Sequence, residues 1–143
     1  MQITEIRIKL LENTSSRQRL CAFCSIILDD AFVVRDIKIL SGNQGYFIAM
    51  PSRKLAFHCP HCRQKNSIGS NFCSHCGGRI AQSDPYRKLL TTCPNKAFVD
   101  VAHPINAASR DRVHRAIIEA YEAELERSRQ PNYVSSYQEY GDD

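Results

Sequence analysis

The sequence from Leu20 to Met50, LCAFCSIILDDAFVVRDIKILSGNQGYFIAM, contains three apolar runs separated by two short turns. The first run, LCAFCSIIL, is apolar at both odd and even positions, which favours a central strand or a strand in an interface. Asp29-Asp30 and Ser41–Gly45 are residues typical of tight turns. Because connections this short cannot form a parallel crossover, we expect the three runs to be antiparallel strands.

The residues on either side extend this pattern. Near the N-terminus, apolar residues alternate with charged ones at Ile6, Ile8 and Leu10, the period of two expected for a half-buried strand. One more strand is expected at Phe98–Ala102. From Ala107 to Arg127 the sequence predicts an amphipathic helix, capped by Asn106 or Ser109. Its apolar face comprises Val113, Ile117, Ala120, Tyr121 and Leu125. The predicted fold class is therefore α+β, an antiparallel β-sheet with a C-terminal α-helix.

Residues 55–97 interrupt this pattern and contain five of the seven cysteines. Two Cys-x-x-Cys pairs lie ten residues apart, and each pair forms a tight turn that brings two thiolates to one ion. Two such turns complete the tetrahedral set of sulfurs that zinc accepts, and the pattern is similar to that of zinc ribbons. Four protein ligands leave no position for water, so we expect one structural Zn²⁺ bound by Cys59, Cys62, Cys73 and Cys76.

Neighbouring residues of the insertion fit this interpretation. Gly77 and Gly78 give the second turn the freedom for positive φ, and Phe72 and Ile80 are expected to cover the site. A redox dithiol is a weaker alternative, because a dithiol needs one pair of cysteines and here there are two. The histidines of the insertion are interpreted as spacers, with substitute ligands as the alternative: His58, His61 and His75.

Three cysteines lie outside these two pairs. Cys21 and Cys24 have the same spacing, but they belong to an apolar strand, where residues three apart face opposite sides of the sheet. We therefore expect two buried thiols there and no metal site. Cys93 precedes a proline and is left open between a lone thiol and a further ligand.

The length of 143 residues allows one domain, or one domain with a small module. We expect residues 1–54 and 98–129 to form the sheet-and-helix domain, residues 55–97 the inserted zinc ribbon, and residues 130–143 a flexible tail. No apolar run reaches the roughly 18–20 residues needed to cross a bilayer, and the N-terminus lacks a signal core. These features predict a cytoplasmic protein with no membrane partner, in which the cysteines bind metal rather than form disulfides.

Three stretches resemble the SpoVG family (stage V sporulation protein G, a septation regulator). They are MQITEIRIKLLE at residues 1–12, DDAFVVRDIKILSGNQGYFIAMPSRK at 29–54 and FVDVAHPINAASRDRVHRAIIEAYE at 98–122. The resemblance implies a small cytoplasmic bacterial homodimer that binds DNA or RNA and regulates septation, sporulation or gene expression. Where the family has a short loop after the fourth strand, this sequence carries the cysteine insertion.

Basic residues indicate where nucleic acid could bind. The insertion carries six Lys and Arg residues against a single Asp, whereas residues 98–143 carry more acidic than basic residues. Phosphate contacts are therefore expected after the fourth strand, in the insertion, and at the start of the helix, although each residue could equally be a solvated surface charge. The candidates are Arg53, Lys54, Arg63, Lys65, Arg79, Arg110, Arg112 and Arg115.

The leading hypothesis is a nucleic-acid-binding regulator of the SpoVG type, whose zinc ribbon extends the contact surface. The alternative is a protein-interaction adaptor in which the ribbon docks a protein partner. An enzyme is not expected, because the sequence offers no open metal site, no nucleophile–base pair and no phosphate loop. Accordingly, no small-molecule substrate is expected either. Phe57, Phe72 and Tyr86 could stack on bases, but we expect the first two to cover the zinc.

Overall fold

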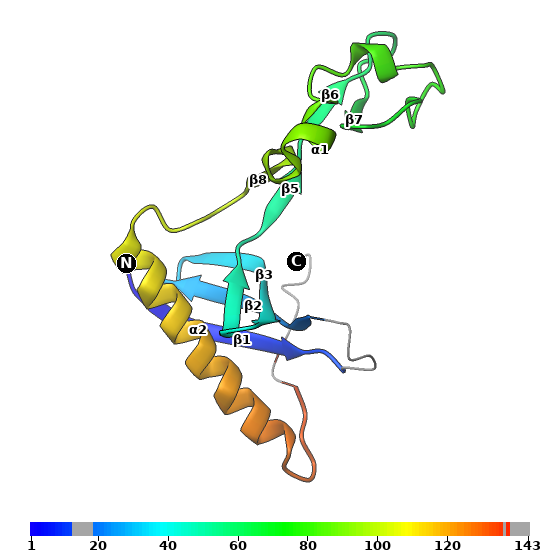
Figure 1. Ribbon diagram of the computed structural model, residues 1–143. Helices are drawn as coiled ribbons and strands as arrows, with labels where there is room; N and C mark the ends of the chain where they lie inside the picture. Colours follow the sequence, from blue (N-terminus) through cyan, green and yellow to red (C-terminus); the bar gives the residue numbers. More distant parts are fainter. Residues whose placement is uncertain (13–18, 136, 138–143) are drawn as a thin grey trace. The chain divides into compact units, whose positions relative to one another are not determined.

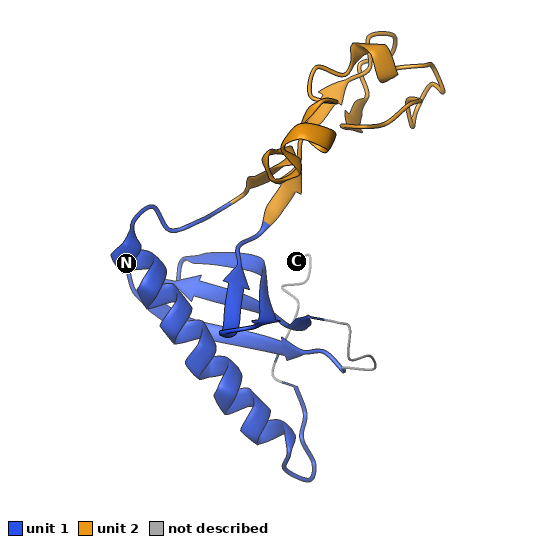
Figure 2. Ribbon diagram, in the orientation of Figure 1, with its two compact units in different colours: residues 1–51, 102–143 blue, residues 52–101 orange. Residues whose placement is uncertain are grey.

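The chain is represented by a computed structural model that describes residues 1–12, 19–135 and 137 (Figure 1). It divides into two compact units (Figure 2). Unit 1 consists of residues 1–51 and 102–143, and unit 2 consists of residues 52–101. Each unit has its own cluster of buried apolar side chains. Unit 2 is therefore an insertion between the sheet and the helix of unit 1.

Unit 1 is built on a four-stranded antiparallel sheet in the order β1-β2-β3-β4, as predicted. Its strands are β1 (Ile3–Leu10), β2 (Leu20–Leu28), β3 (Phe32–Gly42) and β4 (Gly45–Ala49). β2 lies between β1 and β3, and each of its residues is buried or half-buried. This central position explains why its sequence is apolar at both odd and even positions.

The turn between β2 and β3 has a backbone that few residue types tolerate. Asp29 and Asp30 both have φ of 52°, and the Ala31 N–H donates to the Leu28 carbonyl at 2.9 Å. These two left-handed residues and Ala31 form the three-residue loop between the paired Leu28 and Phe32. Aspartate adopts this conformation more readily than most side chains, which accounts for the Asp-Asp pair.

Helix α2 (Ala107–Ser128) packs on one face of this sheet (Figure 1). Asn106 is its N-cap, because its side-chain oxygen accepts a hydrogen bond from the Ser109 N–H at 2.8 Å. Val113, Ile117 and Tyr121 are buried, and the rings of Tyr121 and Tyr46 meet edge to face at 5.0 Å. Neither α2 nor any other described helix is long and apolar enough to span a membrane.

The thiols of Cys21 and Cys24 are buried, as predicted, but they do not face opposite sides of the sheet. Cys21 is the extra residue of a β-bulge in the pairing of β2 with β3, and a bulge breaks the alternation of side chains. Its thiol donates to the Arg19 carbonyl at 3.4 Å, and both thiols belong to the buried cluster that includes Tyr121 of α2. Burial raises the pKa of Cys24 to about 12.

Unit 2 consists of short elements. They are β5 (Ser52–Lys54), β6 (Ala56–His58), β7 (Lys65–Ser67), a 3₁₀ helix (Ala81–Ser83), α1 (Leu89–Thr92), a second 3₁₀ helix (Pro94–Ala97) and β8 (Phe98–Asp100). β6 and β7 form an antiparallel hairpin, and β5 pairs with β8. The buried cluster contains Phe57, Ile68, Ile80 and Ala97 together with two of the cysteines.

The pairing of β5 with β8 places both strands in unit 2, whereas the sequence placed their residues in the sheet-and-helix domain. The units divide at 51/52 and 101/102, compared with the expected 54/55 and 97/98. The strand predicted at Phe98–Ala102 is present as Phe98–Asp100. Alternating apolar residues indicate a strand but not the strand with which it pairs. The sequence therefore did not show that β5 and β8 pair within unit 2, and the expected unit boundaries differ by a few residues.

The C-terminal segment contacts the rest of unit 1 through two tyrosines. The Tyr133 hydroxyl donates to Glu124 Oε1 at 2.5 Å, and the Tyr137 hydroxyl lies 3.4 Å from Ser25 Oγ. Glu124 is itself buried near the end of α2 and also accepts from Arg127 Nη1 at 2.9 Å. The tail predicted for residues 130–143 thus contacts unit 1 at these two described positions, and its residues 136 and 138–143 lie outside the described part of the chain.

Candidate metal centre

The two Cys-x-x-Cys pairs of unit 2 adopt the same local geometry. In the first, the Cys59 N–H donates to the Gln64 carbonyl at 2.8 Å and its own carbonyl accepts from the Arg63 N–H at 2.9 Å. In the second, the Cys73 N–H donates to the Gly78 carbonyl at 2.9 Å and its carbonyl accepts from the Gly77 N–H at 3.1 Å. Each turn therefore places its two thiols on the same side, toward the other turn.

Each turn also aims a backbone N–H at its first sulfur. The N–H groups of His61 and His75 lie 3.4 Å from Cys59 Sγ and Cys73 Sγ, respectively. These bonds favour the thiolate over the thiol, because an N–H group stabilises the negative charge on sulfur. Thiolates are the form in which cysteine binds a metal.

Positive φ occurs at the equivalent position of both turns, at Arg63 (63°) and Gly77 (74°). Gly78 has a different role from the one predicted, since its φ is not in the left-handed region. A Cβ at Gly78 would lie 3.2 Å from the His61 ring and 3.4 Å from Cys76 Sγ, and its N–H also points at that sulfur at 3.4 Å. Because Gly78 has no side chain, its backbone can lie close to the Cys76 sulfur and the His61 ring.

The structure brings the four predicted ligands together. Their sulfur atoms lie within 4.8 Å of one another, with 3.7 Å between Cys59 and Cys76 and 3.5 Å between Cys62 and Cys73. A tetrahedron with Zn–S bonds of about 2.3 Å has edges of about 3.8 Å. All four cysteines are free of disulfides. Four sulfurs at this spacing can hold one metal ion, and the all-thiolate donor set suits a soft tetrahedral ion.

The pKa values of these thiols show why a cation is needed. The Cys76 N–H is the main cause that lowers the pKa of Cys73 to about 5, and the Cys62 N–H likewise lowers that of Cys59. At Cys62 the Gln64 N–H lowers the pKa, but burial and the neighbouring thiols outweigh it and raise the value to about 11. Four thiolates cannot share this space unless a positive ion balances their charge.

Asn66 supports the second pair and was not predicted from the sequence. It is 95% buried, with a relative exposure of 5%. Its Nδ2 donates to Cys73 Sγ at 3.4 Å and to the Gln64 carbonyl at 3.0 Å, and its Oδ1 accepts from the Ser74 N–H at 2.9 Å. A single Asn in a short polar strand carries no sequence signal, so only the structure could identify it.

Phe57 and Ile80 are buried in the same cluster as Cys59 and Cys73, and Ile68 completes the apolar cover. The prediction that Phe72 covers the site is wrong, because this side chain is 63% exposed. Phe72 pairs with Arg79 in an isolated antiparallel bridge. Cys73 is buried, so its neighbour Phe72 points in the other direction along the extended backbone.

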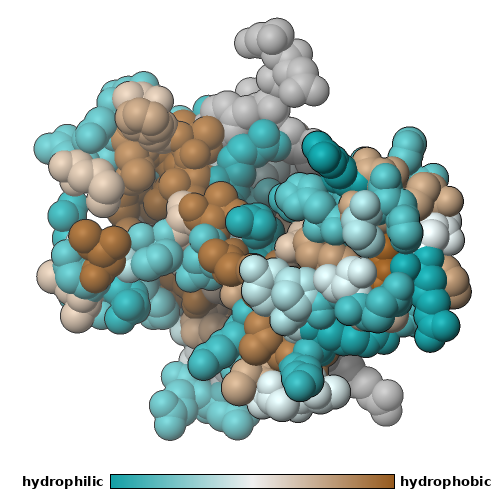
Figure 3. Space-filling model, turned by 90° about the horizontal axis from the view of Figure 1, so that it is seen from above, coloured by the Kyte–Doolittle hydropathy of each residue, from teal (hydrophilic) through white to brown (hydrophobic). Residues whose placement is uncertain are grey.

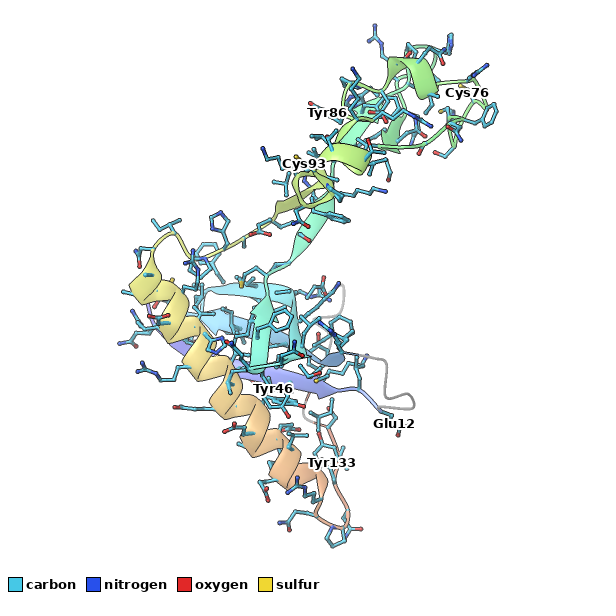
Figure 4. The ribbon with its side chains drawn as sticks, viewed as in Figure 1. Glu12, Tyr46, Cys76, Tyr86, Cys93 and Tyr133 are labelled. Carbon is cyan, nitrogen blue, oxygen red and sulfur yellow. The ribbon has the colours of Figure 1, made fainter. Side chains whose placement is uncertain are left out.

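The remaining candidates lie outside the cluster. His58, His61 and His75 are exposed, and the group of potential ligand atoms that lie together contains the four cysteines only, among the described residues. Cys93 is exposed beside α1 and away from Cys76 (Figure 4).

All eight residues predicted to contact nucleic acid are exposed. Five belong to unit 2, and Arg110, Arg112 and Arg115 lie in the first turns of α2. Arg112 and Arg115 line a hollow together with Glu119 of the same helix, Ile3 of β1 and Gln2, the residue before β1. Ion pairs between described residues join Glu5 to Arg7, Glu124 to Arg127 and Glu126 to Arg129, and none of them involves the eight.

The fold and the site define a class of protein: an α+β domain with a four-stranded antiparallel sheet and one helix, carrying an inserted unit with a four-thiol centre that could bind a metal ion. The sequence model of the SpoVG family matches residues 1–123. The chain therefore belongs to the SpoVG family, as its motifs indicated.

Curated relatives, each named "Putative septation protein SpoVG", agree with this assignment. The relative from Desulforudis audaxviator is 36% identical over 123 residues, which cover 85% of this chain and 92% of the relative. That from Agathobacter rectalis is 36% identical over 126 residues, covering 88% and 98%. That from an Anaeromyxobacter species is 30% identical over 137 residues, covering 96% and 98%.

Proposed function

We propose that the chain is a nucleic-acid-binding regulatory protein of the SpoVG type, in which one Zn²⁺ ion held by four cysteines keeps unit 2 folded. The relatives' name ties the family to septation, and we extend a regulatory role in that process to this chain. The proposal for nucleic acid rests on charge and exposure, and the proposal for zinc rests on the donor set.

The observation that carries the proposal is the charge of unit 2. Its residues, 52–101, include eight Lys and Arg against two Asp, whereas unit 1 carries more acidic than basic residues. One of the two carboxylates, that of Asp84, accepts hydrogen bonds from the N–H groups of Gly69 and Tyr86 at 2.7 and 2.9 Å. A small unit with this excess of free cations attracts a polyanion, and phosphate contacts then supply most of the binding free energy.

The start of α2 offers a second basic surface. Arg110, Arg112 and Arg115 are exposed there, with Asp111 between them and Glu119 in the hollow that Arg112 and Arg115 share. We propose that these three arginines add phosphate contacts from unit 1 to those of unit 2.

The proposed Zn²⁺ has a structural role. Cys59, Cys62, Cys73 and Cys76 would hold it, and it would supply the charge that lets four thiolates share one site. Unit 2 has a small buried cluster and short strands, so metal binding contributes directly to its folding free energy.

We further propose that the protein is a homodimer. α2 covers one face of the sheet, and Val33 and Phe47 are exposed apolar residues of the same sheet. Apolar strand residues of this kind are covered readily by a second copy. Sedimentation at micromolar concentration, with a mass of one chain or two, tests this part.

Fluorescence anisotropy of labelled mixed-sequence DNA and RNA tests nucleic-acid binding. We expect the affinity to fall at least about tenfold between 50 and 200 mM salt. Neutralising even three phosphates releases enough counterions to cause a fall of that size. Two variants with three charges removed are compared: Arg63, Lys65 and Arg79 to Gln in unit 2, and Arg110, Arg112 and Arg115 to Gln in α2. Arg129→Gln is the control. The proposal is contradicted if the affinity does not change with salt concentration, or if the protein does not bind at 50 mM salt.

An adaptor function is the second candidate, favoured by the exposed apolar side chains of Val99 and Val101 in unit 2. In that case a defined protein partner remains bound after nuclease treatment and is lost from Cys73→Ser. Retention of the partner by Cys73→Ser, or its release by nuclease, contradicts this candidate.

A further inference from the structure

Unit 2 exposes aromatic rings that its buried cluster does not use. Phe72 is 63% exposed and Phe98 is 54% exposed, whereas Phe57, in the same unit, is buried beside the cysteines. Single exposed apolar residues are common on protein surfaces, so what distinguishes Phe72 and Phe98 is the residue that lies beside each ring.

Each exposed phenylalanine lies directly opposite a basic residue on the neighbouring strand. Phe72 is opposite Arg79 in the bridge that leads into and out of the second cysteine turn, and Phe98 of β8 is opposite Lys54 of β5. Side chains directly opposite in an antiparallel pair point to the same face, with Cβ atoms about 4.5–5.5 Å apart. The structure therefore presents two ring-and-cation pairs, each on one face of a short antiparallel ladder.

From these pairs we infer that unit 2 binds single-stranded nucleic acid, with bases stacking on Phe72 and Phe98 and the adjoining Arg79 and Lys54 contacting phosphate. The inference rests on the proposed function and names the form of nucleic acid that unit 2 takes. A flat ring can stack on a base only where the base face is open, as in a single strand, whereas in a duplex both faces are already stacked. The cation beside the ring then meets the phosphate that follows the base.

Charge favours this partner over a protein surface or a lipid. The cations of unit 2 outnumber its carboxylates by eight to two, and neither Arg79 nor Lys54 forms an ion pair with a described residue. In Figure 3, hydrophobic side chains gather at the left of the view, whereas hydrophilic side chains predominate at its right. Phe72 and Phe98 each lie opposite a cation, and a ring beside a cation suits a polyanion with open base faces.

The test uses the natural lack of tryptophan in this chain. Phe72→Trp and Phe98→Trp each introduce a single indole into the full-length, zinc-loaded protein. We expect a mixed-sequence single-stranded 20-mer to quench the indole fluorescence. An oligomer of equal length made of abasic deoxyribose phosphates has the same charge but no bases, and it should leave the fluorescence unchanged. Phe32→Trp is the matched control, because Phe32 is an exposed strand residue of unit 1 that lies opposite Leu28.

Alanine variants measure the contribution to affinity. We expect Phe72→Ala and Phe98→Ala to weaken binding of the single strand by about 5- to 100-fold each, and to leave binding of the abasic oligomer and of a duplex unchanged. Phe72→Tyr retains a stacking ring and should bind like the original protein. Zinc content and circular dichroism establish that each variant is folded.

The outcomes separate the inference from the function on which it rests. The inference is overturned if neither indole is quenched and both alanine variants bind with unchanged affinity. In that case the proposed function still stands as long as the original protein shows salt-dependent binding. Equal losses on single strand, abasic oligomer and duplex overturn it as well, because stacking on bases cannot produce them. Failure of the original protein to bind any of these probes at 50 mM salt overturns both.

Discussion

Asn66 donates a hydrogen bond from Nδ2 to the sulfur of Cys73 at 3.4 Å. The two residues come from different parts of unit 2: Asn66 is the middle residue of β7, and Cys73 begins the second cysteine turn. Since the Asn66 Oδ1 also accepts from the Ser74 N–H, this one buried amide ties the hairpin of the first turn to the second turn. Groups that hydrogen-bond to metal ligands fix the ligands' positions and favour their charged form.

Asn66→Ala is therefore expected to weaken Zn²⁺ binding by about 10- to 100-fold, because it removes a donor to the Cys73 sulfur and leaves the Ser74 N–H without its acceptor. Competition with a chelator of known affinity measures the effect. Gln64→Ala is the matched control, since its exposed side chain lies in the same hairpin and only its backbone takes part in the site. Equal loss in both variants would mean that Asn66 has no special role.

Loss of one cysteine ligand should unfold unit 2 and leave unit 1 folded. We expect Cys73→Ser to abolish amide-exchange protection in β6 and β7 and to preserve it in β1–β4, because the two units have separate buried clusters. Cys93→Ser removes an exposed thiol outside the site and should change neither pattern. A single cooperative loss of protection across the whole chain would show that the units do not fold separately.

The sequence predicted those features that depend on spacing. The period of residues Ile6, Ile8 and Leu10 identified β1, and the spacing of the four cysteines identified the candidate ligands, because both are properties of local geometry. Cys21 shows where such reasoning fails: one extra residue in the pairing with β3 reverses the expected side, and nothing in the sequence marks it.

The sequence also did not predict which segments lie opposite each other in the fold. The pairing of β5 with β8, the buried Asn66 and the exposure of Phe72 each depend on which segment lies opposite, and no periodicity records that. Phe72 shows this clearly. From composition alone, an aromatic residue next to a candidate metal ligand is expected to cover the metal site. Its neighbour Cys73 already occupies the inward position, so an extended backbone turns Phe72 outward.

Gly69 is the glycine of unit 2 whose replacement should be most damaging. Its φ is +84°, and a Cβ there would lie 2.5 Å from the Leu90 Cδ1, so Gly69→Ala combines backbone strain with a forced shift of the Leu90 side chain, which packs against the buried cluster. We expect a loss of about 1–3 kcal/mol in the stability of unit 2, measured by denaturant unfolding of the zinc-loaded protein. Gly77→Ala, with a similar φ and open space around its Cβ, reports the backbone part alone. If both variants lose the same stability, the contact with Leu90 has no effect.

Alkylation tests which thiols the proposed metal ion and the core protect. With iodoacetamide at pH 7, we expect one modified residue, Cys93, in the zinc-loaded protein. Cys21 and Cys24 are protected by burial, which also raises the pKa of Cys24 to about 12 and keeps it as the unreactive thiol. Removal of zinc by a chelator should add four modifications, for a total of about five by intact mass. Seven modifications without chelator would contradict both the metal site and the buried thiols.

Tyr133→Phe tests whether the C-terminal segment stabilises unit 1. Glu124 is 6% exposed on α2 and accepts hydrogen bonds from the Tyr133 hydroxyl and from Arg127. Removing the hydroxyl leaves a buried carboxylate with one partner fewer, so we expect a loss of about 1.5–3 kcal/mol in urea unfolding of unit 1. Glu126→Gln is the control: it breaks the exposed pair with Arg129, in which both side chains are more than 70% exposed, and such pairs contribute about 0–1 kcal/mol. Should Tyr133→Phe cost no more than this control, the contact with Glu124 does not hold the segment to unit 1, and residues after α2 would behave as the flexible tail that the sequence predicted.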